Sequence, residues 1–228
     1  MAGVRLRVAP RARRMTLRID SLSGRPVLTV PPGLPECEIT RFLDAQQGWI
    51  AARLAEQPPR RRLAPGATVP LRGHDLVILH DAHHPRSPQI ADGSLCLGGP
   101  VKRVEARLLD WLRATARQDL TARVTAHARA LDLPAPPFTL RDTRSRWGSC
   151  STRGRLNFSW RLVCAPPHVL DYVAAHEVAH LLEMNHSPRF WGLVDRLVDH
   201  APDSRVWLRK HGPALLLIGP PPSSRAAA

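Results

Sequence analysis

The sequence HEVAH at residues 176–180 constrains the fold of this chain more than any other stretch. It lies in a mostly apolar run with helical periodicity, so His176 and His180 are expected on one face of a helix, one turn apart. Side chains at this spacing have Cβ atoms about 5 to 6 Å apart, which lets both imidazoles reach one Zn²⁺ ion. Glu177 points to a neighbouring face, where it can reach a water on the metal and act as a general base. The motif therefore predicts a zinc site built on a helix.

His186 is the expected third ligand, six residues after His180. Catalytic zinc usually has three protein ligands and one open position. A continuous helix would carry His186 away from the other two histidines, so the helix must end between them. We expect it to run to about Met184 and to break at Asn185, which tolerates left-handed backbone, just before Pro188.

Two features of the sequence bear on the kind of zinc site. The interval of six residues is the one found in H-E-x-x-H-x-x-G-x-x-H metalloproteases, but Glu183 stands at the position of their glycine. Cys150 or Cys164 could instead complete a closed, structural zinc site with four protein ligands. Three histidines with a glutamate next to the first favour the catalytic interpretation.

The composition limits the setting in which the protein works. A formal net charge of +14 attracts polyanions such as nucleic acid or nucleotides, although a solvated arginine-rich surface explains the same charge. The four cysteines lie far apart without a C-x-x-C pair, which argues against a disulfide framework. Neither a signal peptide nor a run of about 18 apolar residues is evident. We therefore expect a soluble cytoplasmic protein without a membrane partner.

The spacing of strand and turn signals predicts an α+β fold in two parts followed by a tail. Residues 1–98 alternate short strand-like runs with turns, which indicates a β-rich region, and residues 36–57 have the pattern of one helix within it. Residues 99–218 are expected to form the hydrolase domain. The tail at residues 219–228 is rich in Pro, Ser and Ala and is expected to be disordered.

Within the second part, a long helix is expected over residues 101–131, where apolar residues recur at helical spacing. Residues 138–141 and 155–160 have the composition of strands. They flank a turn-like segment at residues 147–151, so we expect a hairpin there, before the helix that carries HEVAH.

Four segments carry a pattern shared with a known protein family: RDTRSRWGSCS at residues 141–151, NFSWRL at 157–162, HEVAH at 176–180 and NHSPRFW at 185–191. With them the chain resembles the YgjP-like metallopeptidase family, most strongly over residues 101–212. MTLRI at residues 15–19 and VPPG at 30–33 are similar to the N-terminal part of that family.

The resemblance implies a zincin-like metallopeptidase domain, related to SprT-like and Wss-type proteases, whose active-site helix packs on a small β-sheet. It also implies one Zn²⁺ per chain, bound by His176, His180 and His186, with Glu177 as the catalytic residue. Fold and metal follow from such a resemblance more directly than the substrate does.

Three further side chains are candidates for substrate binding. Arg144 and Arg146 could clamp an anionic substrate or stabilise negative charge in the transition state, although a rigid hairpin with a structural role explains the segment equally well. Tyr172, the only tyrosine, precedes His176 by one helical turn. It could donate a hydrogen bond to a developing oxyanion, but a buried structural tyrosine is the more common alternative.

Three functions fit these features, and peptide-bond hydrolysis is the one we expect, with a protein or peptide as substrate. Hydrolysis of nucleoside triphosphates, by pyrophosphohydrolase or phosphohydrolase chemistry, is the alternative to which members of the similar family have been linked. The sequence has no P-loop and no cluster of carboxylates for Mg²⁺. A third interpretation is nucleic-acid binding, either alone or as the means by which DNA recruits a protease.

Overall fold

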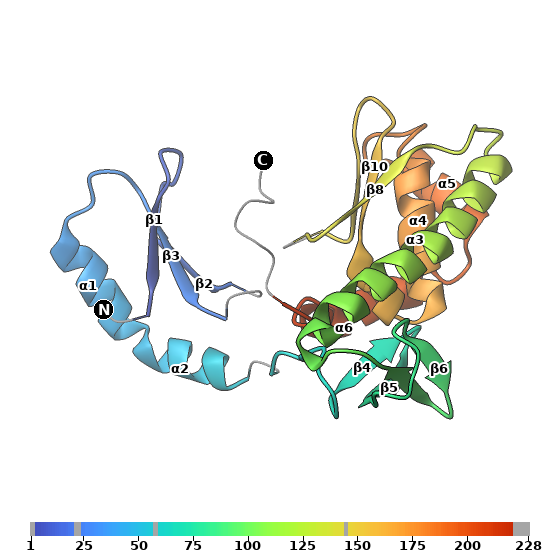
Figure 1. The fold of residues 1–228 in the computed structure, drawn as a ribbon. Helices are drawn as coiled ribbons and strands as arrows, with labels where there is room; N and C mark the ends of the chain where they lie inside the picture. The colour runs from blue at the N-terminus through green and yellow to red at the C-terminus, as the bar shows by residue number, and fades with distance from the viewer. Residues whose placement is uncertain (1–2, 21–23, 57–58, 144–145, 221–228) are drawn as a thin grey trace. The chain divides into compact units, whose positions relative to one another are not determined.

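The computed structural model describes residues 3–20, 24–56, 59–143 and 146–220 (Figure 1). Within these ranges the chain forms six α-helices and three small β-sheets, so the predicted α+β class is confirmed. The chain divides into two compact units, Met1–Pro59 and Arg60–Ala228. All but the first two residues of the tail expected at residues 219–228 lie outside the described ranges.

The first unit contains a three-stranded sheet. Its central strand is β3 (Pro26–Val30), which runs parallel to β1 (Arg5–Val8) and antiparallel to β2 (Thr16–Ile19). The core of the unit joins this sheet to the helix that follows, through Leu28, Val30, Ile39 and Leu43.

The single helix predicted over residues 36–57 is in fact two helices, α1 (Glu36–Ala45) and α2 (Gln47–Ala55). They meet at Gln46, whose φ of −100° and ψ of 3° depart from helical values. α1 buries two side chains in the core of the unit, whereas α2 buries none and packs against that core through the partly buried Ile50.

A four-stranded sheet opens the second unit, in the order β4 (Thr68–Leu71), β5 (His74–His80), β7 (Ser94–Leu97) and β6 (Gln89–Ala91). Strands β5 and β7 are parallel, and the other two pairs are antiparallel. Apolar side chains of this sheet share one core with the long helix that follows, including Ile78, Leu95 and Leu108. The sheet therefore folds with the second unit, whereas we expected residues up to 98 to belong with the N-terminal part.

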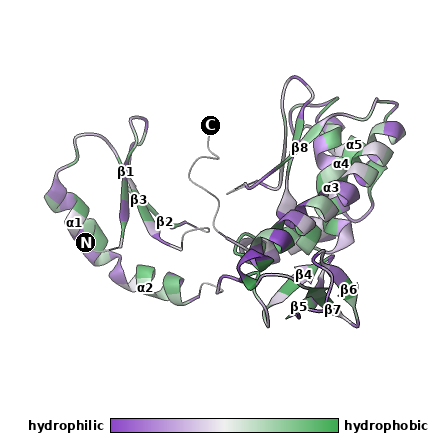
Figure 2. Ribbon diagram, in the orientation of Figure 1, coloured by the Kyte–Doolittle hydropathy of each residue, from purple (hydrophilic) through white to green (hydrophobic). Residues whose placement is uncertain are grey.

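The long helix of the second unit is α3 (Val104–Ala130), close to the predicted range. A row of apolar residues at four-residue steps is buried along it, consisting of Val104, Leu108, Leu112, Ala116, Leu120 and Val124. Hydrophilic residues occupy many of its other positions, so that both classes alternate along its length (Figure 2). No helix among the described residues is long and apolar enough to cross a membrane.

A second three-stranded sheet corrects the predicted hairpin. β8 (Phe138–Arg141) and β10 (Leu156–Ser159) are the expected strands, but they pair in parallel. The segment that we predicted to be a turn contains a strand of its own, β9 (Gly148–Cys150), which pairs antiparallel with β10 and forms one edge of the sheet. Small residues in β9 concealed this strand, because glycine and serine are more typical of turns.

Three helices complete the unit: α4 (Pro167–Ala179), α5 (Pro188–Leu197) and α6 (Ala201–Leu215). α4 is buried along most of its length and packs against α3, α5, α6 and β9. The chain then returns to the start of the unit, where the N–H of Arg61 donates to the carbonyl of Leu217 at 3.1 Å and the N–H of Gly219 donates to that of Arg61 at 2.9 Å.

Candidate metal centre

The end of α4 and the turn after it bring three histidines together. His176 lies in the last turn of α4, His180 caps its C-terminal end, and His186 lies two residues before α5. Each offers a ring nitrogen, and these nitrogens all lie within 4.8 Å of one another. The structure thus clusters the three residues that the sequence selected as metal ligands.

The helix ends at Ala179, earlier than the end near Met184 that we predicted. The N–H groups of Leu181 and Leu182 donate to carbonyls three residues back, at 3.0 and 3.1 Å. Such bonds tighten the last turn of a helix and bring its axis to an end. His180 therefore still lies above His176, but the chain after it is free to change direction.

Two side chains shape the turn that returns the chain to the site. The Oδ1 atom of Asn185 accepts a hydrogen bond from the N–H of Ser187 at 3.1 Å. The hydroxyl of Ser187 in turn accepts from the N–H of Phe190 at 3.3 Å and so caps α5, with Pro188 in its first turn. These bonds hold His186 between two fixed points, close to the other two histidines.

The protonation of His180 and the separation of two of the ring nitrogens are compatible with a tetrahedral metal ion. Nδ1 of His180 lies 2.9 Å from the carbonyl oxygen of Glu183, which can only accept, so this nitrogen carries the proton and Nε2 is left unprotonated. The Nε2 atoms of His176 and His186 are 3.2 Å apart. Two ligands of a tetrahedral zinc with bonds of about 2.0 Å lie about 3.3 Å apart.

The chemistry of the cluster also suggests which metals suit it. Its three donors are all imidazole nitrogens. Such nitrogens suit zinc and other transition ions, whereas Mg²⁺ and Ca²⁺ prefer oxygen ligands.

A buried phenylalanine packs against all three imidazoles. The ring of Phe190 stacks on that of His180 with centroids 4.4 Å apart, and it meets His176 and His186 edge to face, both at 4.8 Å. Because Phe190 is fully buried, its ring cannot move aside, and the imidazoles are held in their orientations by packing.

Burial favours the neutral form of the two helix histidines. It lowers the pKa of His176 to about 4, and the positive charges of His180, His186 and Arg205 act in the same direction. Burial also lowers the pKa of His180, against the hydrogen bond to the carbonyl of Glu183. A metal ligand must be unprotonated, so the lowered pKa values of His176 and His180 favour the form that can bind a metal.

Glu177 lies in a closely confined space beside the histidines. It is 5% exposed, and burial raises its pKa to about 7, although the Arg146 guanidinium acts in the opposite direction. Gly148 on β9 borders this space directly: a Cβ atom at position 148 would lie 2.7 Å from the carboxyl carbon of Glu177. The carboxyl group therefore has a pKa near neutral pH, as suits a group that both accepts and returns a proton.

The histidines and Glu177 face a hollow of about 290 Å³. One wall is the edge strand β9, and the opposite wall comes from α4 and the turn after it. The hollow is lined by Arg146, Gly148, Ser149, Cys150, His176, Glu177, His180, Met184 and His186.

The three side chains predicted to bind substrate differ in their position relative to the hollow. Arg146 is exposed and lines the hollow beside Glu177. Tyr172 is 6% exposed and its ring meets that of His176 at 5.8 Å, but it is not among the lining residues, and burial raises its pKa. Arg144 lies outside the described residues.

The sequence did not indicate several residues that shape the site. Gly148 and Ser149 line it from a strand that we took for a turn, and Met184 lies in the turn after α4. Arg205 on α6 lies over the Trp191 ring at 4.7 Å and adds positive charge near His176. Only the position of Gly148 directly after Trp147 offered a signal, and spacing alone could not connect it to Glu177.

Comparison with known proteins bears on the family of the chain. Neither the curated proteins nor the solved structures contain a match to it. The model of the YgjP-like family, described as a YgjP-like metallopeptidase domain, matches residues 13–211. Because this match spans most of both units, with all three clustered histidines and Glu177 inside it, the chain belongs to the YgjP-like metallopeptidase family.

Proposed function

We propose that the protein is a zinc-dependent peptidase in which His176, His180 and His186 hold the metal and Glu177 is the general base. The observation that carries the proposal is the convergence of three imidazole nitrogens within 4.8 Å beside a buried carboxyl group whose pKa is raised to about 7. Membership of a metallopeptidase family supports the same reaction class.

The roles of the side chains follow from their positions. When bound, the metal supplies Lewis acidity, which polarises the scissile carbonyl and makes water more acidic. A carboxylate oxygen of Glu177 takes the proton from the attacking water and later returns it to the leaving amine. Arg146, on the rim of the hollow, helps to keep Glu177 ionised until it takes that proton.

The edge strand β9 suggests how an extended peptide would bind. β9 pairs with β10 on one side, and its other edge is not paired with any strand of the described residues. An extended chain can add to such an edge through backbone hydrogen bonds. Because Gly148, Ser149 and Cys150 line the hollow, a peptide on this edge would present its backbone to Glu177.

Hydrolysis of a nucleoside triphosphate remains the competing function. In the part of the chain that the structure describes, Arg146 is the one arginine that lines the hollow, so the site offers less cationic support than a triphosphate usually receives.

We also propose that the protein works in the reducing cytosol. Its four cysteines are unpaired, which supports this location.

The experiment that tests this function compares the wild-type protein with Glu177→Gln. Both are loaded with Zn²⁺, their metal content is measured, and both are offered an unfolded protein, a protein bound to DNA, and nucleoside triphosphates. Glu105→Gln, an exposed change on α3, is the matched control.

We expect cleavage of the protein substrates by the wild type and the control, and a loss of about a hundredfold or more in Glu177→Gln at unchanged zinc content. Triphosphate cleavage with the same dependence on Glu177 would show that the protein is a nucleotide hydrolase instead of a peptidase. If no substrate is turned over in a way that depends on Glu177, the metal centre is not the catalytic site that we propose.

A further inference from the structure

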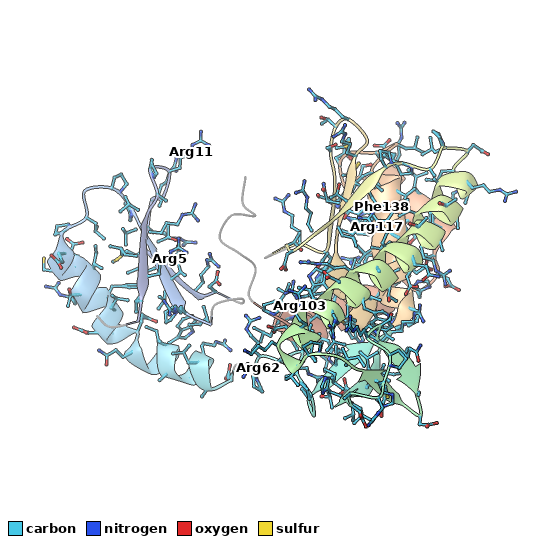
Figure 3. The ribbon with its side chains drawn as sticks, in the orientation of Figure 1. Arg5, Arg11, Arg62, Arg103, Arg117 and Phe138 are labelled. Atoms are coloured by element: carbon cyan, nitrogen blue, oxygen red, sulfur yellow. The ribbon has the colours of Figure 1, made fainter. Side chains whose placement is uncertain are left out.

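Three arginines that line no part of the metal hollow surround a separate cavity of about 390 Å³. Arg113 and Arg117 lie one turn apart on α3, and Arg141 is the last residue of β8. Arg117 lies beside Phe138, with its guanidinium carbon 5.5 Å from the ring centroid (Figure 3). The other lining residues are Ala114, Leu140, Asp142 and Trp160.

The carboxylate of this cavity is already neutralised. Asp142 forms an ion pair with Arg161, whose fully buried guanidinium lies over the Trp160 ring at 4.5 Å. The negative charge of Asp142 is therefore balanced from within the protein and cannot balance the arginines that line the cavity.

The three lining arginines have no such partner. Among the described residues none of them forms an ion pair, and Arg141 donates only to the amide oxygen of Asn157, at 3.2 Å. Every aspartate and glutamate of the chain lies within the described ranges, so the residues outside them bring no acidic side chain. Three positive charges border one cavity without a carboxylate to balance them.

Trp160, which also lines this cavity, has a hydrogen-bond donor without a partner in the described part of the chain. Its side chain is 1% exposed, and its indole N–H has no hydrogen-bond acceptor among the described residues. Buried donors nearly always have an acceptor in native proteins. A ligand with several oxygen acceptors in the cavity would provide one.

We propose that this cavity binds a phosphate group, carried by a free phosphate ester or by a nucleic-acid backbone. Guanidinium groups keep their charge at any physiological pH and bind phosphate oxygens through paired N–H donors. A helix and a strand supply the donors here, so the ligand is held by two elements of the fold rather than by one mobile loop.

The phosphate site is distinct from the metal centre but connected to it along the chain. Within the described ranges the two hollows share no lining residue. Asp142 borders the arginine cavity and Arg146 borders the metal hollow, and the hydroxyl of Thr143 donates to the carbonyl of Arg146 at 2.5 Å. The inference does not depend on which bond the metal centre hydrolyses.

The test compares two triple variants of the full chain that remove the same charge. The first is Arg113→Gln, Arg117→Gln and Arg141→Gln. The control is Arg129→Gln, Arg196→Gln and Arg209→Gln, all of which change helix residues that line neither hollow. Inorganic phosphate is titrated by ³¹P NMR, and ATP and a labelled single-stranded oligonucleotide are titrated by competition and by fluorescence anisotropy.

We expect the first triple variant to weaken phosphate binding by about tenfold or more and the control to weaken it by less than about threefold. Stronger binding of the oligonucleotide than of ATP, with a smaller salt dependence in the first variant, would identify the nucleic-acid backbone as the source. The reverse order would identify a free phosphate ester.

Equal losses in both triple variants, or no phosphate binding by the wild type at low salt, would overturn the proposal. Replacement of the same three arginines by lysine separates a loss of the site from a loss of the fold, because lysine keeps the charge without the paired donors. We expect the lysine variant to bind phosphate with an intermediate affinity and to unfold at the wild-type temperature.

Discussion

Gly148 leaves free the space that the side chain of Glu177 needs. Its missing Cβ atom would stand 2.5 Å from Cγ and 2.7 Å from Cδ of the glutamate, well inside van der Waals contact. The neighbour that would have to move is a 5% exposed side chain on a buried helix. The position of the carboxyl group that we propose as the general base is therefore limited by a residue on another element, β9.

Gly148→Ala should consequently lower the hydrolytic rate by about ten- to a hundredfold, since small displacements of a catalytic group have effects of this size. Zinc content should stay at the wild-type level because the histidines are untouched. Gly192→Ala, on α5 with nothing within 4 Å of the added methyl, is the control and should keep full activity. Wild-type rates in Gly148→Ala would show that Glu177 adjusts freely and that the glycine has no positioning role.

Metal binding should stabilise the fold through the three histidines. Zinc at a hundred times its dissociation constant adds about 2.7 kcal/mol, which corresponds to a rise in Tm of about 5 to 10 °C for a chain of this size. His186→Ala should abolish this rise, while His84→Ala, at an exposed position, should preserve it. Thermal unfolding of chelator-treated and zinc-loaded samples provides the measurement, and an undiminished rise in His186→Ala would remove His186 from the ligand set.

The buried position of Glu177 predicts a pH-dependent effect on the stability of the metal-free protein. Burial raises its pKa from 4.5 to about 7, so between these values the folded protein holds a proton that the unfolded chain has lost. The contribution of Glu177 to the free energy of unfolding therefore falls as the pH rises through this window. The amide introduced by Glu177→Gln cannot ionise, so the free energy of unfolding of that variant does not fall for this reason.

Glu177→Gln should thus have nearly wild-type stability at pH 4.5 and should become progressively more stable than wild type up to about pH 7. Urea unfolding of both metal-free proteins at several pH values measures the difference. A constant difference across this range would mean that the carboxyl group is ionised in the folded state throughout.

Asp171 on α4 joins three elements of the second unit away from the hollow. It accepts a hydrogen bond from Nε2 of His127 at 2.8 Å, and it lies 3.6 Å from Nε of Arg123 and 3.5 Å from Nε2 of His200. Burial by itself raises the pKa of Asp171, but the bond from His127 and these positive charges outweigh it and hold the pKa below its usual range.

Asp171→Asn should lower the free energy of unfolding at neutral pH by about 1 to 3 kcal/mol, because a charge-assisted bond in a mostly buried place is lost. A lowered carboxyl pKa gives stability that is present above the unfolded value and is lost as the pH falls through the folded one, so the deficit should shrink in acid. Asp199→Asn, at a fully exposed carboxylate, is the control. Equal effects of the two changes at neutral pH would contradict a specific role for the buried carboxylate.

The cluster of three histidines could be predicted from the sequence because it depends on local features. His176 and His180 need only a helix, and His186 needs only a turn of the right length, which Asn185 and Ser187 supply through bonds to their nearest neighbours. Such features depend on a few consecutive residues, so they can be recognised without knowledge of the tertiary contacts around them.

The parts that could not be predicted depend on contacts between distant residues. The strand β9 is held by pairing with β10, and its small side chains alone favour a turn. The sheet at residues 68–97 was grouped with the wrong neighbours because its apolar face does not reveal which helix it will cover. The space beside Glu177 exists only once Gly148 lies against α4, a relationship that no spacing in the chain expresses.

The hydrogen bonds between Arg61 and the Leu217–Gly219 segment bear on where the two ends of the second unit can be placed. They place the entry and the exit of the second unit side by side, so a short linker could join residues 60 and 220 without disturbing the core. New ends could then be opened in the exposed loop at residues 151–153, giving a circular permutant with the same packing. We therefore expect the second unit to reach the same fold whether its ends lie at residues 60 and 220 or in this loop.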